Sequence, residues 1–161
     1  MGARGLTDTE KWVLGFVFKD TLPYDLIGIT PNIGLGDRPY TLPNYTIWDW
    51  QAWDVNMGTQ QHWDKLAAKY GWDYFWQILV HELTHVWQGH NKTVQWGYVA
   101  NSVWHQLTAG QDAYKYTLGQ SWNSYNAEQQ ASIVQDWFAN GRKEDDPAFG
   151  YIRDNIWQGK G

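Results

Sequence analysis

Residues His81 to His85 have the types and the spacing of a catalytic zinc site. They read His-Glu-Leu-Thr-His, the H-E-x-x-H pattern in which two histidines bind the metal. On an α-helix two residues four apart lie on one face, with Cβ atoms ~5–6 Å apart, so both imidazoles can bind one Zn²⁺. Glu82 is rotated about 100° around the helix from His81, which places its carboxylate beside the ion. The pattern therefore predicts a zinc site with Glu82 as the general base.

The residues around this pattern predict a helix that holds the two histidines away from an apolar face. Asp73 is expected to cap the start of the helix, and Gly89 to take the left-handed conformation just past its end. His81, His85 and Gln88 fall outside the apolar face, so we expect a metal-binding helix that lies under a cleft. The apolar face consists of Phe75, Trp76, Leu79, Val80, Leu83, Val86 and Trp87.

The remainder of the chain predicts an α+β fold that is mainly helical with a small sheet. Capping boxes at residues 7–10 and 126–129 open helices that run to about 20 and 139. Residues 59–70 form a further helix that stops at Gly71, and Asp146-Pro147 opens the last one, toward residue 157. Strands are expected at residues 24–30 and 45–48, a loop at 32–43, and an irregular Trp-rich segment after the second strand.

Length and composition predict one domain over residues 1–161 and exclude several functions. The absence of cysteine rules out disulfides and thiolate zinc sites, which leaves histidine and carboxylate as the strong ligands. The net charge is −5, from 17 acidic and 12 basic residues without a basic cluster, so nucleic acid and anionic membranes are not expected partners. The N-terminal residues lack the apolar core of a signal peptide, and no apolar run reaches membrane-spanning length.

A catalytic zinc ion takes three protein ligands, and the third is not evident from the pattern. His90 lies beyond the predicted end of the helix. The longer metzincin pattern would need glycine at 88 and histidine at 91, where the chain has Gln88 and Asn91. A glutamate in the thermolysin setting is also absent, because residues 100–110 contain no carboxylate.

Glu128 begins a predicted helix and can project rigidly from its first turn. A carboxylate at that position also stabilises the helix dipole by ~0.3–1 kcal/mol, which is a purely structural explanation. By pattern alone the third ligand therefore stays open among Glu128, His105, Asp112 and Asp136.

Three stretches of the chain resemble metallopeptidase domains of bacterial secretion machinery. They are residues 10–25 (EKWVLGFVFKDTLPYD), 80–88 (VHELTHVWQ) and 114–137, in which Tyr114-Lys-Tyr116 precedes the run N-A-E-Q-Q-A. Such domains include the C-terminal domain of specialised type VI VgrG spike proteins and zinc peptidases associated with Rhs proteins or contractile injection systems. The resemblance implies a zincin-like (gluzincin-like) fold with an H-E-x-x-H helix, and Glu128 as the third ligand. The Trp-rich segment 48–76 has no match in the family, so substrate specificity is not implied.

The resemblance implies a site in which His81, His85 and Glu128 bind Zn²⁺. Glu82 would then accept a proton from water and pass it to the leaving amine of a peptide. The strand at 45–48 is expected to pair with the substrate backbone, by analogy with zincins. That analogy also calls for a second donor to the oxyanion, for which Tyr116 ranks first among Tyr114, Tyr116, Tyr125, His90 and His105.

The function implied is that of a zinc-dependent endopeptidase acting as a secreted effector or toxin, directed against bacteria or a host. Its expected partners are a peptide or protein substrate, a secretion spike as carrier, and an immunity protein that blocks it. It would leave the cell through a secretion system that needs no signal peptide and act in the target cell's periplasm or in a host cell. Alternatives are a zinc amidase or endopeptidase acting on peptidoglycan, and a non-catalytic, metal-stabilised cargo or binding module. The presence of Glu82 argues against the last, because a structural site needs no base.

Overall fold

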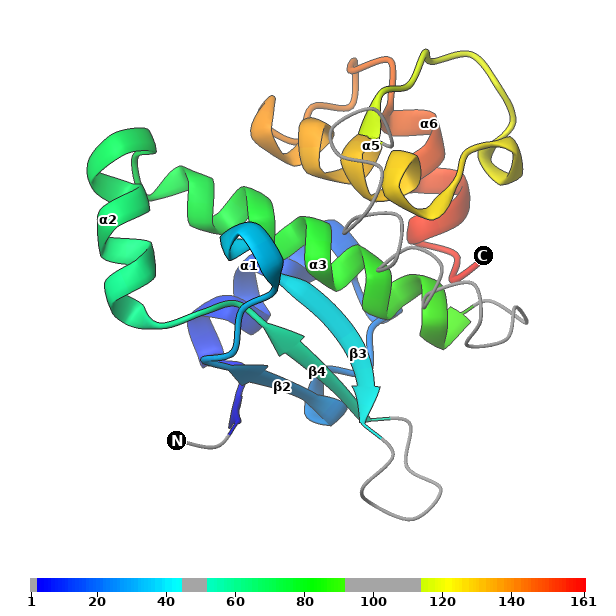
Figure 1. Cartoon of the computed structure of the whole chain (residues 1–161). Coiled ribbons are helices and arrows are strands. Elements are labelled where there is room, and N and C mark those ends of the chain that lie inside the picture. The colour runs from blue at the N-terminus through cyan, green and yellow to red at the C-terminus, as the bar shows by residue number, and fades with distance from the viewer. Residues whose placement is uncertain (1–2, 45–51, 92–113) are drawn as a thin grey trace.

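The computed structural model describes residues 3–44, 52–91 and 114–161, and these form a mixed α+β fold (Figure 1). The strands are β1 (Arg4–Gly5), β2 (Ile27–Thr30), β3 (Tyr40–Asn44) and β4 (Ala52–Asn56). The longer helices are α1 (Asp8–Phe18), α2 (Gln60–Tyr70), α3 (Asp73–Asn91) and α5 (Ala127–Ala139). A short helix α6 (Phe149–Tyr151) continues as a π-helical turn (Ile152–Ile156), and 3₁₀ turns occur at Tyr24–Leu26, Leu35–Asp37 and Trp122–Ser124.

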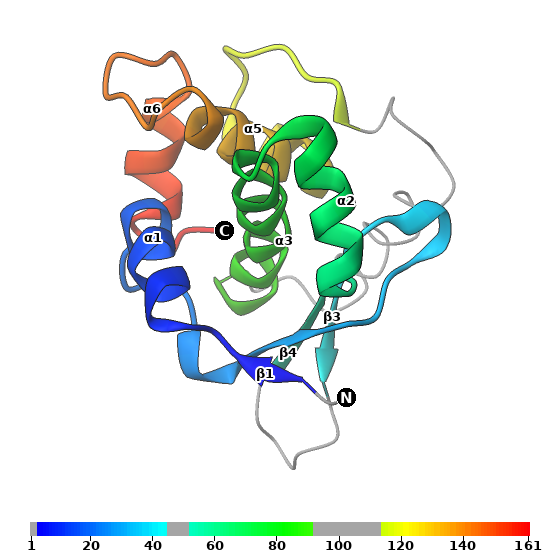
Figure 2. The same cartoon turned by 90° about the vertical axis from the view of Figure 1, so that its left-hand side faces the viewer.

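Helix α3 lies at the centre of the fold, between the sheet and helix α5. The two views at right angles show the sheet on one side of α3, α5 on another, and α1 and α2 flanking it (Figures 1 and 2). Every residue from Leu79 to Gln88 is therefore buried, including His81 and His85. The histidine side of the helix, which lies outside the predicted apolar face, is also buried because α5 packs against it.

The sheet ends in an edge strand that the sequence patterns did not locate. The strand order is β1-β2-β4-β3, with β2 and β4 parallel and the two outer pairs antiparallel. The edge strand β3 occupies residues for which we predicted a loop, while the strand predicted at 45–48 lies outside the described residues. Pro43 favoured the loop prediction, but an edge strand tolerates proline because its outer side needs no ladder hydrogen bond.

Two other predictions about the sheet also need correction. Strand β4 lies in the Trp-rich segment that was predicted to be irregular, and its Trp53 and Val55 point into the core. The strand predicted at 24–30 starts only at Ile27, because a 3₁₀ turn takes up Tyr24–Leu26.

Both predicted capping boxes are present. The backbone N–H of Glu10 donates to Thr7 Oγ1 at 3.1 Å, and the Thr7 N–H donates to the Glu10 carboxylate at 2.8 Å. The same reciprocal pair joins Asn126 and Gln129, at 2.8 and 2.9 Å. The second box fixes the start of α5, so that Glu128 stands in its first turn with a defined direction.

The last helix begins later than predicted. Asp146 accepts a hydrogen bond from the N–H of Ala148 at 2.8 Å, which forms a turn before α6 opens at Phe149. No helix in the described ranges has both the length and the apolar character that crossing a bilayer requires.

Gly89 was predicted to lie just past the end of helix α3, but it lies inside the helix. The helix continues to Asn91, and Asp73 stands within its first turn instead of capping it. A Cβ atom at position 89 would lie 2.1 Å from Cη2 of Trp53. Glycine is therefore needed here because the indole of β4 packs directly on the helix backbone.

Gly89→Ala is expected to lower the free energy of unfolding by about 1–3 kcal/mol, because the new methyl group must displace the Trp53 ring. The matched control is Gly15→Ala in α1, where no atom lies within 4 Å of the added Cβ. That change should leave stability unchanged or raise it by roughly 0.5–1 kcal/mol. Urea unfolding of both variants measures the difference, and equal stabilities would contradict the packing argument.

Candidate metal centre

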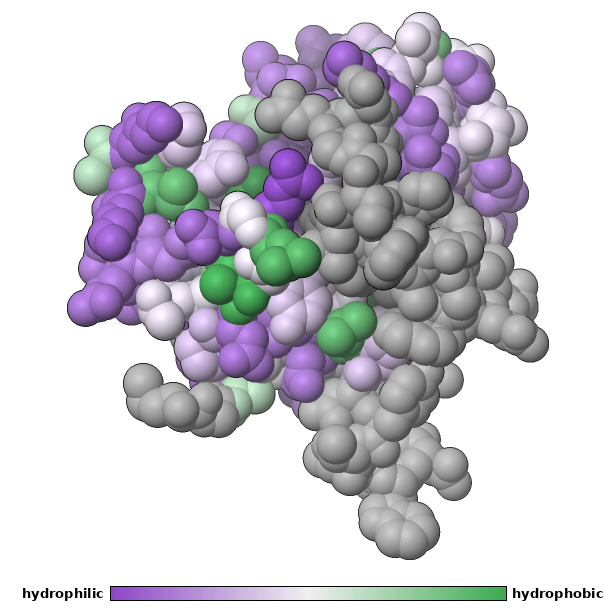
Figure 3. Space-filling model, viewed as in Figure 1, coloured by the Kyte–Doolittle hydropathy of each residue, from purple (hydrophilic) through white to green (hydrophobic). Residues whose placement is uncertain are grey.

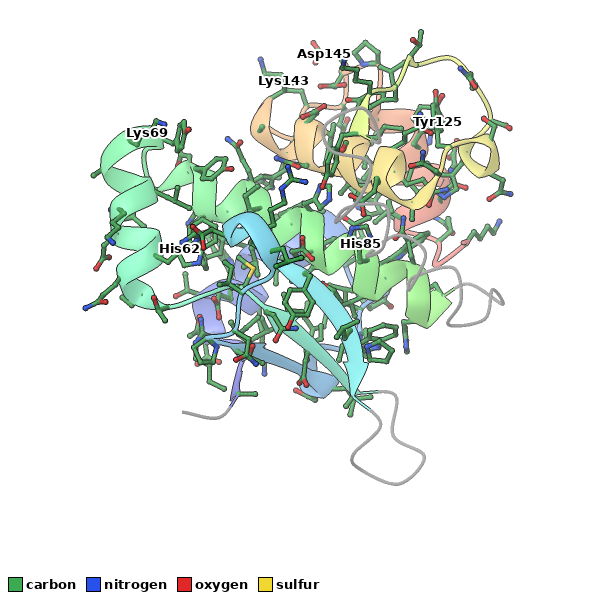
Figure 4. All side chains as sticks on the ribbon, in the orientation of Figure 1. His62, Lys69, His85, Tyr125, Lys143 and Asp145 are labelled. Atoms are coloured by element: carbon green, nitrogen blue, oxygen red, sulfur yellow. The ribbon has the colours of Figure 1, made fainter. Side chains whose placement is uncertain are left out.

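Helices α3 and α5 bring His81, His85 and Glu128 together. Nε2 of His81 lies 3.1 Å from one carboxylate oxygen of Glu128, and Nε2 of His85 lies 3.1 Å from the other. The three ligand atoms lie within 4.8 Å of one another, and none of the three residues is more than 4% exposed. Figure 4 shows His85 on α3, below the ribbon of α5. This buried group could therefore hold a metal ion.

The other residues considered as third ligand do not join this group. Asp136 is exposed on α5, where its carboxylate accepts a hydrogen bond from the Tyr116 hydroxyl. His90 is exposed near the end of α3 and is not part of the cluster. His105 and Asp112 lie outside the described residues.

A chain of amides fixes the orientation of the His85 ring. Nδ1 of His85 lies 2.8 Å from Oε1 of Gln88, whose Nε2 donates to the backbone carbonyl of Ala127 at 2.9 Å and to Gln130 Oε1 at 3.0 Å. Gln130 in turn donates to the carbonyl of Trp122 at 2.9 Å. Backbone carbonyls only accept, so Gln88 must present its oxygen to His85. His85 therefore carries a proton on Nδ1 and directs Nε2 toward Glu128.

His81 is oriented in the same way, by Gln135 of α5. The His81 Nδ1 atom lies 2.9 Å from Oε1 of Gln135, which leaves Nε2 directed at Glu128. Metal-binding histidines usually donate their second ring N–H to an oxygen of this kind, which holds the ring in place. Gln88 and Gln135 were not identified as site residues from the sequence, although Gln88 lies three residues after His85 on the same helix.

The Nε2 atom of His85 indicates that a cation fits between these side chains. It is buried and has no hydrogen-bond partner in the described part of the chain, although a Glu128 oxygen lies 3.1 Å away. The lone pair of a neutral imidazole and a carboxylate oxygen repel each other unless a proton or a metal ion lies between them. Two imidazole nitrogens and one carboxylate form a ligand set that suits Zn²⁺ and leaves a fourth position open.

Without a metal, a proton stabilises this cluster. Burial lowers the pKa of His85, but the negative charges of Glu128 and Glu82 outweigh it and raise that pKa to about 9. Burial raises the pKa of Glu128, but His85 and His81 more than compensate, so that its pKa falls well below the ordinary value. At neutral pH the metal-free group therefore holds a proton on His85, in a place that a metal ion could take instead.

The free energy of unfolding of the metal-free protein is expected to fall as the pH rises from about 6.5 to about 9. His85 has a pKa of about 9 in the fold and an ordinary pKa of 6.5, so the folded state holds an extra proton in this window. Losing that proton removes up to about 3 kcal/mol of stability. Glu128 adds no pH dependence here, because it is ionised in both states.

Urea unfolding at several pH values, with chelator or with Zn²⁺, tests this expectation. Zinc replaces the proton, so the zinc-loaded protein should not lose stability across the same window. A metal-free protein that is equally stable at pH 6.5 and 9 would contradict the assignment of the buried proton.

The Glu82 carboxylate is held in place by the edge strand. Glu82 is 1% exposed, and Thr41 of β3 donates its hydroxyl proton to Oε2 of Glu82 at 2.8 Å. This contact joins residues 41 positions apart, and no local pattern signals it. The sheet thus orients the predicted base, while α5 orients the predicted ligands.

A cleft of about 700 Å³ opens beside these groups. His81 and Glu82 line it together with Tyr114, and residues of α2 line it as well. Figure 3 shows the face of Figure 1, on which hydrophobic side chains gather near the middle while hydrophilic ones cover α2. The base and one ligand are therefore reachable from a cavity large enough for several side chains of a ligand.

Tyr116, which we ranked first as a second donor, does not line this cleft. Its hydroxyl donates to Asp136, and burial together with that carboxylate raises the pKa of the phenol. Tyr125 donates to the carbonyl of Thr117 at 2.7 Å. Tyr114 lies at the cleft instead, with its ring centroid 5.7 Å from that of His81. The sequence pattern gave no direction for the Tyr116 side chain, because residues 115–118 form no helix or strand that would fix it.

Comparison with known proteins gives one informative likeness. No protein-family model and no curated protein matches the chain. Among solved structures it resembles the effector domain of VgrG2b from Pseudomonas aeruginosa, with a TM-score of 0.60 and 24% sequence identity. The matched region covers 93% of this chain and 82% of that domain. At this level of identity the likeness establishes a shared fold.

Proposed function

We propose that this chain is a zinc-dependent endopeptidase domain with a zincin-like fold. The observation that carries the proposal is the position of Glu82, whose oriented carboxylate shares a cleft with one of three buried potential ligands. A structural zinc site has no use for a carboxylate placed in this way. The side chains that hold the two imidazole rings, Gln135 and Gln88, are neutral amides. Glu128 is therefore the ligand whose negative charge would offset that of a divalent ion.

His81, His85 and Glu128 would hold Zn²⁺, which lowers the pKa of water to ~7 and polarises a carbonyl group. Glu82 accepts the proton of the attacking water and returns it to the leaving amine. Thr41 keeps the Glu82 carboxylate directed at the cleft during both transfers. Tyr114, which lines the cleft and whose ring contacts that of His81, would donate a hydrogen bond to the developing oxyanion.

The edge strand β3 supports binding of an extended peptide. Its inner side pairs with β4, and Thr41 within it contacts Glu82. A substrate backbone that adds to the outer side of β3 would pass close to the base, and main-chain hydrogen bonds would supply affinity.

We further propose that the domain is a secreted effector. The shared fold with the VgrG2b effector domain supports this role, together with the sequence resemblance described above. A secretion spike would carry it into a target cell's periplasm or a host cell, and an immunity protein would protect the producing cell.

The test is a protease assay on purified protein of known zinc content. Unfolded protein substrates should be cleaved by the zinc-loaded form, and a chelator should abolish cleavage until zinc is restored. Digestion of purified cell-wall sacculi, with unfolded proteins left intact, would replace this proposal by peptidoglycan hydrolysis. A zinc-loaded protein that cleaves neither would point to a binding or cargo module.

A further inference from the structure

One wall of the cleft carries basic side chains that the proposed chemistry does not use. His62 and Lys65 of α2 line it, three residues apart and so on the same helix face. Arg38, just before strand β3, lines it as well. Figure 4 shows His62 on the side of α2 that faces the rest of the molecule. Among the described residues that line the cleft, the acidic ones are Asp37 and Glu82. This basic wall stands out because the whole chain has a net charge of −5.

His62 has a polar atom that needs a partner. Its Nε2 is buried, and no described residue forms a hydrogen bond with it. The ring packs edge-on against Trp63, with centroids 5.3 Å apart, and a Cβ at Gly58 would lie 3.1 Å from its Cδ2 atom. The ring is therefore confined on both sides. A buried polar atom without a partner is destabilising, so a ligand that bonds to Nε2 removes this penalty.

The base of the same wall is apolar. Trp63, Leu66 and Ile78 line the cleft beside the basic groups. This arrangement suits a side chain with methylene groups that contact the apolar residues and a carboxylate that reaches His62 and Lys65. A purely apolar side chain would leave His62 Nε2 unsatisfied, and a cationic one would meet like charge from Lys65.

We propose that this basic wall is a specificity subsite that binds a carboxylate of the peptide substrate. This inference rests on the proposed peptidase function, which it deepens by naming the substrate class. The carboxylate can come from a glutamate side chain or from the C-terminus of a peptide, since both present the same group. His62 and Lys65 bind it directly, and Arg38 adds positive charge to the wall. Screening by salt should weaken the preference, because Lys65 is exposed.

The test measures binding of fluorescent peptides to the zinc-loaded Glu82→Gln protein, which should retain the cleft and hydrolyse the peptides too slowly to affect the measurement. One peptide carries a central glutamate with both ends blocked, the second has glutamine at that position, and the third has glutamine and a free C-terminal carboxylate. We expect one of the two carboxylate peptides to bind roughly tenfold tighter than the blocked glutamine peptide. The carboxylate peptide that binds more tightly identifies the source of the carboxylate.

Lys65→Glu in this background should abolish the preference, and His62→Leu should reduce it severalfold. The matched control is Lys69→Glu, the same charge reversal on α2 at a fully exposed residue that does not line the cleft. Equal binding of all three peptides, or equal losses for Lys65→Glu and Lys69→Glu, would overturn the subsite.

Cleavage by the unmodified protein separates this inference from the proposed function. If the protein cleaves no peptide while the binding preference persists, the peptidase proposal fails and the carboxylate site stands. If the peptides are cleaved at equal rates and bound equally, the peptidase stands and the subsite is wrong.

Discussion

Glu82→Gln is expected to lower the rate of peptide hydrolysis roughly 10²–10⁴-fold, the usual contribution of a positioned general base. Glutamine has the same shape and can still accept the hydrogen bond from Thr41, so the packing around position 82 is preserved. The amide cannot accept a proton at neutral pH, and both proton transfers are lost. Zinc content and the free energy of unfolding should stay close to those of the unmodified protein, because Glu82 is not one of the clustered ligands.

Thr41 supplies a graded control for this prediction. Thr41→Ser keeps the hydroxyl that bonds to Oε2 of Glu82 and should retain most activity. Thr41→Val is similar in shape but removes the donor, so the Glu82 carboxylate is less well oriented. The rate of peptide hydrolysis should therefore fall in the valine variant and stay close to that of the unmodified protein in the serine variant. Full activity of Glu82→Gln would eliminate Glu82 as the base.

The part of the site that could be predicted from sequence is the part held by one helix. His81, Glu82 and His85 occupy adjacent turns of α3, so their relative positions follow from helix geometry alone. Glu128 lies 47 residues after His81, and a capping box shows only that it begins a helix. Its pairing with the histidines depends on how α5 packs on α3, which the pattern leaves undetermined.

Two of the residues that sequence reasoning missed act across elements. Thr41 reaches Glu82 from an edge strand, and Gln135 reaches His81 from α5. Neither contact has a local signature, because each joins residues from different elements. Gly89 was also misread from its local sequence. Glycine favoured a helix end at this position, but the side chain is absent because the Trp53 ring of β4 packs against the helix backbone there.

The two capping boxes, in contrast, were predicted correctly because their contacts are local. Thr7 and Asn126 satisfy backbone N–H groups three residues ahead, and this interaction needs no tertiary partner. The sheet was predicted less well because short strands depend on their neighbours for hydrogen bonds. Strand β4 in particular is stabilised by β2 on one side and β3 on the other, so its own Trp-rich sequence carries little signal.

Glu128→Gln is expected to weaken zinc binding by at least about 100-fold, because changes to residues that only support ligands already cost 10–100-fold. The change keeps the shape of the side chain but removes the negative charge that lies 3.1 Å from both Nε2 atoms. Competition with a chromophoric chelator measures the affinity, and activity should fall in parallel at limiting zinc.

The metal-free Glu128→Gln variant should show a second effect. Without the main charge that raises its pKa, His85 should lose its proton below pH 9, and the fall in stability between pH 6.5 and 9 should shrink.

Asp136→Asn is the matched control for Glu128→Gln, since it removes one negative charge from the same helix. Asp136 is exposed and pairs with Tyr116, so its substitution should change neither zinc affinity nor the pH dependence of stability. If Asp136→Asn weakened zinc binding and Glu128→Gln did not, the third ligand would be Asp136. If neither variant changed it, the ligand would lie among residues 92–113, which contain His105 and Asp112. The pH measurement on metal-free protein is independent of all three outcomes, because it detects the buried Glu128–His85 charge pair without zinc.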